Sequence, residues 1–381
     1  MNTKILFVID GLEFGGGERC FAQIISRLPK DQYEIFLASA GNNLFYDAIQ
    51  NARVHLIPLD FSRKCNPALF TRLARIIRAE GIDVVHGQGA RAEFYARLAS
   101  GLAKKSKYIS TIAMPVEGYD VGKFQKRAYR FLDRFSERYV DRFIVVSDSL
   151  KERMISQHAV PAEKIVRIYN GIEIDFYNPA EQEDRRAKIR KDLSLDNDVL
   201  LVGAIGRLVW QKGFEYFLQC IPDVIGICSR IKFLLVGEGP LRRPLEDISK
   251  RLGIEPFIIF TGQRNDIRDV LAALDILVIP SVLEGLPMIT IEAMAMGKPI
   301  IATRIDGITE QIRDGKEGLL IASRSPVELG SAIGRIAGDS LLASSLGNAA
   351  RQRVTTEFSV QQMIEATIKV YEELSCPLWI P

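Results

Sequence analysis

Short apolar runs alternate with amphipathic stretches along the first part of the chain. The stretches between the runs, such as residues 18–28 and 69–81, place apolar residues at helical spacing among charged ones. Runs that are apolar nearly throughout and separated by helices predict a parallel sheet covered on both faces. The predicted strands are residues 4–9, 34–39, 54–59, 83–87, 107–112 and 142–147.

The same pattern restarts after residues 176–198, a polar stretch with a proline that we interpret as a connection. Six more strands are predicted at residues 199–206, 232–239, 257–262, 276–281, 298–303 and 318–322. We therefore expect an α/β fold with two doubly wound domains, residues 1–176 and 177–358, and a C-terminal helix within residues 359–381 that joins the first domain. Ligands of such sheets bind beyond the carboxyl ends of the strands, so two facing sheets predict one ligand cleft between them.

The composition fits a two-domain globular protein in a reducing compartment. The chain has 381 residues, 47% of them apolar and 25% charged, which is more than one ordinary core accommodates. Its five cysteines are odd in number and show no C-x-x-C spacing, which argues against a disulfide framework or a zinc site. We find neither a signal peptide at the start nor an apolar run long enough to span a membrane, so we expect a cytoplasmic protein.

Charge is distributed unevenly along the chain. Residues 1–175 carry a net charge of +6 and the remainder carries −3, which together give the overall +3. The first domain is therefore the one more suited to an anionic partner, although an excess of this size is also typical of a solvated surface. We expect no nucleic-acid partner.

Three consecutive glycines, Gly15 to Gly17, follow the first predicted strand and precede a helix. Glycine lets the backbone approach a ligand closely, and the N-terminus of the helix favours an anion. A dinucleotide fingerprint would need a further glycine where Cys20 stands, so an NAD site is disfavoured. We interpret the turn as facing a phosphate or a sugar, with a plain tight turn as the alternative.

Two cations follow the strand that opens the second domain. Arg207 and Lys212, in "GRLVWQKG", offer a planar fork and a point charge, a pair suited to a diphosphate. Residues 236–244, "VGEGPLRRP", follow the next strand, and a structural turn explains their glycines at least as well as ligand contact does.

The stretch "PSVLEGLPMITIEAMAMGKP", residues 280–299, holds two glutamates, Glu284 and Glu292. A loop leads to Pro287, which favours a first helical turn, so the amides of Met288 and Ile289 should form an anion site. Glu284 and Glu292 would flank that site and accept hydrogen bonds from hydroxyl groups on either side. The alternative is that Glu292 pairs locally and Glu284 is a solvated loop residue.

Asp196 and Asp198 form an Asp-x-Asp pair, which can hold a divalent metal under a nucleotide. They lie in the polar connection, where turn chemistry accounts for them. We predict no metal site and no metal requirement.

Taken together, these motifs resemble the retaining glycosyltransferases of family 4, which have the GT-B fold of two facing Rossmann-like domains. The resemblance is carried by "GRLVWQKG", "VGEGPLR", "FTGQRNDIRDVLAALDILVIPS" and "EGLPMITIEAMAMGKPIIAT", and also by "VVSDSLKE", "IYNGIEIDFYNP" and "GGGERC". It implies transfer of a hexose from a nucleoside diphosphate sugar, with a UDP-sugar favoured and GDP-mannose an option, and no further cofactor. The acceptor would be a glycan or a lipid-linked saccharide bound by the first domain, in bacterial surface polysaccharide or lipopolysaccharide synthesis.

The resemblance also implies roles for individual residues. Arg207 and Lys212 would clamp the donor diphosphate, Glu292 would bind the ribose, and Glu284 would hold the transferred sugar. The loop that assists through its backbone comprises Gly285, Leu286, Pro287, Met288 and Ile289. Gly16 and Gly17 would close over the phosphate, and the base would lie near Arg264.

One departure from the family concerns a histidine. Many relatives carry one after the strand that here ends in "STIAMP", where this chain has Ala113 and Met114. His86 is the nearby histidine, and it would serve the acceptor side or pack at a strand end. The departure keeps two rival functions open: a nucleotide-sugar epimerase of similar fold and a catalytically inactive saccharide-binding protein. A glycosidase also needs two carboxylates, but the cationic pair would have no role in it.

Residues 123–142 predict a helix with a basic and an apolar face. Its cations are Lys126, Arg130, Arg134, Arg138 and Arg142, and its apolar stripe is Phe131, Leu132, Phe135 and Tyr139. This pattern predicts peripheral contact with an anionic membrane or with the acceptor. The alternative is a plain surface helix in which Asp133, Glu137 and Asp141 pair with the arginines.

Overall fold

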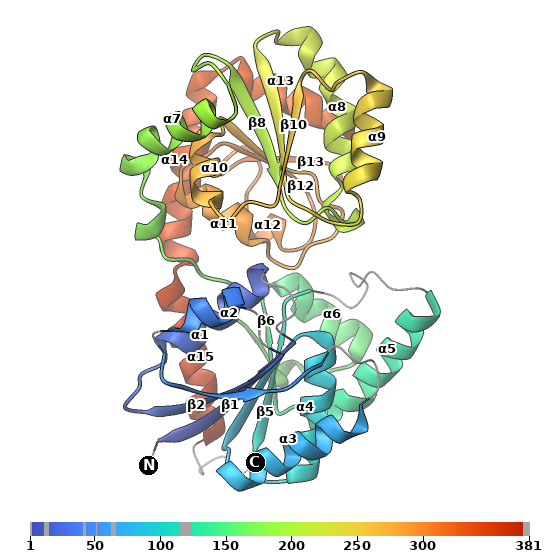
Figure 1. Cartoon of the computed structure of the whole chain (residues 1–381), viewed down its shortest axis with the longest axis vertical. Helices are drawn as coiled ribbons and strands as arrows, with labels where there is room; N and C mark the ends of the chain where they lie inside the picture. Colours follow the sequence, from blue (N-terminus) through green and yellow to red (C-terminus); the bar gives the residue numbers. More distant parts are fainter. Residues whose placement is uncertain are drawn as a thin grey trace. The chain divides into compact units, whose positions relative to one another are not determined.

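The structure is a computed structural model that describes residues 2–10, 15–40, 43–50, 52–61, 66–114 and 123–375. The chain divides into two compact units (Figure 1). Unit 1 comprises Met1–Gly171 and Val360–Pro381, and unit 2 comprises Ile172–Ser359. Both ends of the chain therefore belong to unit 1.

Unit 1 is built on a seven-stranded sheet in the order β3-β2-β1-β4-β5-β6-β7, in which all neighbours are parallel. Its strands are β1 (Thr3–Ile9), β2 (Tyr33–Ser39), β3 (Val54–Pro58), β4 (Val84–Gln88), β5 (Lys107–Ile112), β6 (Arg142–Val145) and β7 (Ile165–Arg167). The six predicted strands are all present. The seventh, β7, has only three residues, too few to give a periodic signal in the sequence.

Two layers of helices cover the sheet of unit 1 (Figure 1). They are α1 (Gly16–Arg27), α2 (Asn43–Ile49), α3 (Pro67–Glu80), α4 (Ala90–Ala103), α5 (Lys123–Ser136), α6 (Asp148–His158) and α15 (Val360–Ser375). α1 packs against α2 and α15, whereas α4 packs against α3 and α5. The amphipathic pattern sets these contacts, since α1 buries Phe21, Ile24 and Ile25 against the sheet.

The predicted helix over residues 123–142 is shorter than expected. α5 ends at Ser136, a 3₁₀ turn covers Glu137–Tyr139, and β6 begins at Arg142. Residues near 141 pair with β5 instead of continuing the helix, because the amide of Asp141 donates to the Tyr108 carbonyl at 2.9 Å and the Asp141 carboxylate accepts from the Tyr108 amide at 2.8 Å. Arg142 is therefore half-buried in the sheet and does not belong to the basic face of α5.

Unit 2 contains a six-stranded sheet in the order β10-β9-β8-β11-β12-β13, again with all neighbours parallel. Its strands are β8 (Leu200–Ile205), β9 (Ile231–Val236), β10 (Ile258–Gly262), β11 (Ile276–Ile279), β12 (Ile300–Thr303) and β13 (Leu319–Ile321), which confirms all six predictions. The strand order reverses between β8 and β11, the switch point where such sheets bind ligands.

The helices of unit 2 are α7 (Gln182–Asp192), α8 (Phe214–Ile227), α9 (Arg242–Leu252), α10 (Ile267–Ala273), α11 (Met288–Ala295), α12 (Ile308–Gln311), α13 (Pro326–Ala337) and α14 (Ser340–Glu357). α7 lies within the predicted connection, so that stretch is more than a linker. Arg190 attaches α7 to the rest of unit 2, because its buried guanidinium donates to Asp275 Oδ2 at 2.7 Å and to the Val199 carbonyl at 2.8 Å. In the part of the chain that the structure describes, no helix is long and apolar enough to cross a membrane.

Candidate functional site

The loop after β8 carries Arg207 and Lys212 and is held by the loop after β9. The Leu208 amide donates to the Glu238 carbonyl at 2.8 Å, and the Leu241 amide donates to the Leu208 carbonyl at 3.0 Å. Gly239 has a φ of +158°, and a Cβ there would lie 2.5 Å from the Leu208 carbonyl oxygen. The glycines of residues 236–244 therefore have the structural role that the sequence left open.

A second close approach joins the same loop to the one after β11. Gly213 has a φ of +61°, and a Cβ there would lie 2.2 Å from the Pro280 carbonyl oxygen. The Val282 amide donates to the Gln211 carbonyl at 2.7 Å. These contacts bring the stretch that ends in Lys212 alongside the loop that carries Glu284.

Lys212 and Glu284 form an ion pair at this junction. The Lys212 ammonium lies 2.6 Å from Glu284 Oε1, which also accepts the Ser281 hydroxyl at 2.7 Å. The Glu284 side chain is 4% exposed and that of Lys212 is 21% exposed. Glu284 is therefore not a solvated loop residue, and the cation predicted for a diphosphate is held beside the carboxylate predicted for a sugar.

Helix α11 begins directly after this loop. Pro287 is its N-cap residue and adds no side-chain cap, and Met288 and Ile289 are its first two residues, as the sequence predicts. Glu292 lies one turn further and is 1% exposed. The helix ends before Gly297, whose φ of +64° lets the Lys298 amide donate to the Ala293 carbonyl at 3.0 Å.

Three residues that sequence reasoning missed fix the backbone of this loop from β12 and α12. The Thr303 hydroxyl donates to the Ser281 carbonyl at 2.6 Å, and the side-chain amide of Gln311 donates to the Pro287 carbonyl at 3.0 Å. At Gly307 a Cβ would lie 1.8 Å from the Gly285 carbonyl oxygen. Thr303 and Gln311 are fully buried, and no sequence pattern marks these two polar residues as buried.

Arg264, the residue predicted near the nucleobase, follows β10 at the same edge of the sheet. Its guanidinium pairs with Asp266, with Nε 2.8 Å from Oδ1. Since β9 separates β10 from β8, Arg264 lies two strands away from the loop of Lys212. Its proposed role is therefore one at the periphery of the site.

The predicted glycine turn opens helix α1 of unit 1. Gly15 is the N-cap residue, its amide donates to Glu18 Oε2 at 3.0 Å, and Gly16 and Gly17 begin the helix. A Cβ at Gly17 would lie 2.5 Å from Gln88 Nε2, so this glycine is required by packing as well as by any ligand. Residues 11–14 of the same motif lie outside the described residues.

His86 is buried in β4 of unit 1. Its Nδ1 lies 2.7 Å from the Tyr371 hydroxyl on α15, and its Nε2 lies 2.7 Å from the Thr111 hydroxyl. Burial lowers the pKa of His86 to about 3, so the ring is neutral. Both nitrogens are engaged, which matches the packing alternative rather than a contact with an acceptor.

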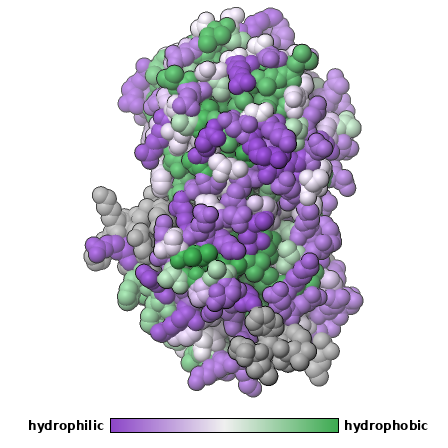
Figure 2. Space-filling model, turned by 180° about the vertical axis from the view of Figure 1, so that it is seen from behind, coloured by the Kyte–Doolittle hydropathy of each residue, from purple (hydrophilic) through white to green (hydrophobic). Residues whose placement is uncertain are grey.

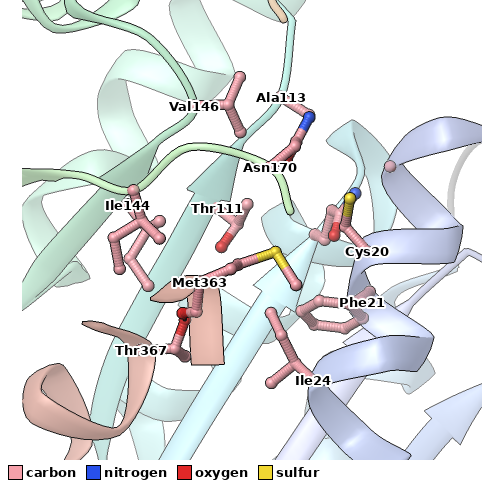
Figure 3. A pocket seen from close by; sticks show the side chains of 13 residues that line it. Cys20, Phe21, Ile24, Thr111, Ala113, Ile144, Val146, Asn170, Met363 and Thr367 are labelled. Atoms are coloured by element: carbon pink, nitrogen blue, oxygen red, sulfur yellow. The ribbon is translucent and has the colours of Figure 1, made fainter. Parts of the chain in front are cut away.

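A small pocket lies beside the start of α1 in unit 1 (Figure 3). Ala113, which stands near the histidine position of relatives, lines this pocket together with Cys20 and Thr111. Met114 is half-exposed next to it. The small side chain of Ala113 therefore borders this pocket at the carboxyl edge of the sheet.

Within the described residues, one group could hold a metal ion: Asp133, Glu137 and His158. Ion pairs account for it, because His158 Nδ1 lies 2.6 Å from Glu137 Oε1 and Asp133 bonds Arg97. Asp198, of the Asp-x-Asp pair, bonds Arg230 instead. The absence of a metal requirement stays a prediction.

Comparisons with known proteins agree with this geometry. The family profile described as "Glycosyltransferase Family 4" matches residues 14–176, and that described as "Glycosyl transferases group 1" matches residues 199–339. An uncharacterized glycosyltransferase of Methanocaldococcus jannaschii is 24% identical over 356 residues, which cover 91% of each chain. The UDP-Gal:α-D-GlcNAc-diphosphoundecaprenol α-1,3-galactosyltransferase of Escherichia coli is 24% identical over 367 residues, 94% of each chain.

The fold is shared with solved glycosyltransferases. The crystal structure of HepE from Anabaena, in complex with UDP-glucose, superposes with a TM-score of 0.85 at 21% identity and covers 98% of this chain and all of its own. The doubly wound units and the matched profiles lead to one conclusion. The chain belongs to glycosyltransferase family 4 and has the GT-B fold.

Proposed function

We propose that the protein is a retaining hexosyltransferase that uses a nucleoside diphosphate sugar, with UDP as the favoured nucleotide. The observation that carries the proposal is the ion pair between the half-buried Lys212 and the buried Glu284 beside the start of α11. A cation and a helix N-terminus suit a diphosphate, and a carboxylate suits sugar hydroxyls. HepE, which was solved with UDP-glucose, supports UDP.

The acceptor we propose is a glycan or a lipid-linked saccharide of bacterial surface polysaccharide or lipopolysaccharide synthesis. The E. coli relative acts, by its name, on a diphosphoundecaprenol-linked GlcNAc, and another solved relative is involved in lipopolysaccharide biosynthesis. Unit 1 would bind this acceptor, and unit 2 the donor. No cofactor beyond the donor is needed for the reaction.

Negative charge develops on the β-phosphate oxygen as the glycosidic bond breaks. Lys212, Arg207 and the amides of Met288 and Ile289 would stabilise that charge; removal of one such preorganised donor typically costs about 3–4 kcal/mol of barrier. In the retaining pathway the departing phosphate takes the acceptor proton on the face where attack occurs. No protein base is then required.

The experiment is a thermal-shift screen of the full chain with UDP, GDP, ADP and their sugar conjugates. A ligand present at 100 times its Kd adds about 2.7 kcal/mol of stability. We expect the largest shift with UDP and its conjugates, and the anomeric configuration of the product, read by NMR, tests retention. A screen in which no nucleoside diphosphate shifts the transition contradicts the proposal.

Two rivals make different predictions in the same assays. A nucleotide-sugar epimerase converts UDP-sugar in the absence of any acceptor. An inactive saccharide-binding protein, which Ala113 and Met114 in place of the family histidine keep open, binds the donor and turns over no acceptor. Donor turnover that depends on acceptor excludes both.

We also propose that α5 docks unit 1 on the inner face of an anionic membrane. Three large apolar side chains of this helix are exposed: Phe131 at 72%, Phe135 at 43% and Leu132 at 39%. Arg134 is exposed, and the Arg138 guanidinium stacks 3.8 Å from the Phe135 ring. The side chains of Lys126 and Arg130 lie outside the described residues.

The acidic residues of this segment do not neutralise the arginines in the way a plain surface helix requires. Asp133 bonds the buried Arg97, Glu137 bonds His158, and Asp141 lies 3.1 Å from the Lys107 ammonium. The face of the helix that reaches solvent is therefore apolar and cationic, the combination that binds anionic bilayers. Hydrophobic residues also reach the surface on the face that Figure 2 shows, which is the back of the view in Figure 1, so exposure alone does not single out this helix.

Sedimentation with vesicles decides the membrane proposal. We expect the chain to pellet with vesicles that contain anionic lipid at low salt, less at high salt, and little with neutral vesicles. Phe131→Ser combined with Phe135→Ser should abolish pelleting, whereas Leu341→Ser, which changes an apolar residue of unit 2 that is 82% exposed, should not. No pelleting of the parent chain at low salt ends the proposal.

A further inference from the structure

The two hydrogen-bond donors of the Glu284 carboxylate meet the same oxygen. The Lys212 ammonium lies 2.6 Å from Glu284 Oε1, and the Ser281 hydroxyl lies 2.7 Å from that same atom. Within the described residues no protein donor reaches Oε2, and this second oxygen is not sealed from solvent. Oε2 is therefore the oxygen that is left for a ligand.

Ser281 is held firmly by its surroundings. Its side chain belongs to a residue that is 1% exposed, and its carbonyl accepts the Thr303 hydroxyl at 2.6 Å. The next residue along the chain is also held, because the Val282 amide donates to the Gln211 carbonyl at 2.7 Å. The short serine side chain on this fixed backbone makes its hydroxyl a fixed donor within the loop.

Lys212 is the less constant of the two donors. Its ammonium stands at the end of a long, flexible stem, and its side chain is 21% exposed. Under the proposed function the donor diphosphate also draws on this ammonium. Ser281 is then the donor that still holds Oε1 of Glu284 once the nucleotide is bound.

We infer that Ser281 is a positioning residue for recognition of the donor sugar: its hydroxyl holds Glu284 Oε1 and so directs Oε2 to the sugar hydroxyls. Both oxygens belong to one planar group, so a donor fixed on one of them sets the direction of the other. A carboxylate that is oriented in advance loses less conformational entropy when the sugar binds. The inference rests on the proposed function, because it needs a donor sugar at Glu284.

A purely structural role of Ser281 predicts a different result. Serine hydroxyls often bond a residue two or three positions away in a turn, and such a bond satisfies a buried polar group without any part in binding. Removal of the hydroxyl would then loosen the whole loop, and binding of UDP and of UDP-sugars would weaken together. A positioning role instead affects the contribution of the sugar alone.

Calorimetry of the full chain with UDP, UDP-glucose, UDP-galactose and UDP-N-acetylglucosamine separates the two roles. The quantity compared is the Kd of UDP divided by the Kd of the UDP-sugar that the parent chain binds most tightly. Ser281→Ala should lower this ratio about tenfold, because a hydrogen bond to a charged group is misaligned, and should change the Kd of UDP itself less than about threefold. Ser281→Cys keeps a weak donor and should lower the ratio less.

A double-mutant cycle tests whether Ser281 acts through Glu284. Glu284→Ala should lower the ratio at least as much as Ser281→Ala does, and the double variant should show no further loss, because no carboxylate remains to be oriented. The matched control is Ser249→Ala, which removes the hydroxyl of a serine that is 2% exposed and lies in α9 of unit 2; it should leave the ratio unchanged. Thermal unfolding of each variant checks that it is folded.

An unchanged ratio in Ser281→Ala, or a further loss when this substitution is added to Glu284→Ala, overturns the inference. Binding of UDP and of the UDP-sugar that weakens in parallel also overturns it and leaves Ser281 a structural role only. In each of these cases the parent chain still binds UDP, so the proposed function stands. If the parent chain binds none of the four ligands, the proposed function falls and the inference falls with it.

Discussion

Replacing Lys212 by methionine removes a cation from a nearly buried carboxylate while keeping most of the side-chain volume. Glu284 Oε1 loses the ammonium at 2.6 Å and keeps the Ser281 hydroxyl at 2.7 Å. Breaking a buried pair from one side typically costs about 3–5 kcal/mol. Because Ser281 remains and the Lys212 side chain is 21% exposed, we expect about 2–3 kcal/mol.

The opposite replacement should cost much less. Glu284→Gln keeps an oxygen for Ser281, and Lys212 can turn to solvent, so we expect about 1 kcal/mol or less. The double variant leaves no unpaired charge and should therefore be more stable than Lys212→Met alone. This asymmetry follows from the burial of the two partners, since Glu284 is 4% exposed.

The assay is unfolding followed by tryptophan fluorescence; Trp210, one of the two tryptophans of the chain, lies two residues before Lys212. A change of 1 kcal/mol shifts the Tm of a domain of this size by about 2–4 °C, so the expected loss of about 2–3 kcal/mol in Lys212→Met should lower the Tm by about 4–12 °C. Adding Glu284→Gln should restore more than half of that loss. If the second substitution restores nothing, the carboxylate is not the group that Lys212 stabilises, and the reasoning fails.

Four other results are expected. Glu292→Ala should raise the donor KM about 10- to 150-fold with little change in kcat, whereas Glu284→Gln should lower kcat and leave UDP binding nearly unchanged. Steady-state kinetics of both variants test this, and if the two effects are exchanged, the roles assigned to Glu292 and Glu284 are reversed. Gln311→Leu should weaken UDP binding about tenfold but uridine binding little, because it frees the backbone at the start of α11, and calorimetry with both ligands measures the ratio. Burial lowers the pKa of His86 from 6.5 to about 3, so between these pH values the unfolded chain binds more protons than the folded chain does. Unit 1 should therefore lose stability as the pH falls below 6.5. Thermal unfolding measured over a series of pH values should show a smaller loss for His86→Gln. EDTA should leave donor binding intact, and a loss that magnesium or manganese restores would contradict the absence of a metal requirement.

The strands of both units were predictable because each is a short apolar run bounded by polar turns. This signal reflects burial of both faces of a parallel sheet, and the edge strand β3 carries it although none of its residues is fully buried. It fails where the run is too short, as in Ile165–Arg167, or where helical spacing continues past the true end of a helix, as in residues 137–142. There the competing strand pairing of Asp141 with Tyr108 decides, and no local pattern contains it.

The sequence allowed the residues of the candidate site to be named, but it did not allow the contacts between them to be predicted. The sequence places Lys212 and Glu284 just after two predicted strands, and the structure shows that these strands, β8 and β11, are neighbours in the sheet. Their direct ion pair does not follow from the strand order, because it depends on Gly213 meeting the Pro280 carbonyl across two loops. The structure also gives His86 two internal partners that lie far from it in the sequence or one strand away.

The ion pair changes how the donor site should be understood before a ligand arrives. A lysine alone in a diphosphate site would be mobile, and ordering it would cost conformational entropy on binding. Glu284, whose Oε1 also accepts the Ser281 hydroxyl, holds the ammonium in place in advance, but the carboxylate also competes with the diphosphate for it. Sugar hydroxyls that donate to Glu284 would weaken this competition, since they share the negative charge of the carboxylate. The complete donor should therefore bind Lys212 more favourably than the nucleoside diphosphate alone, which couples recognition of the sugar to stabilisation of the leaving group.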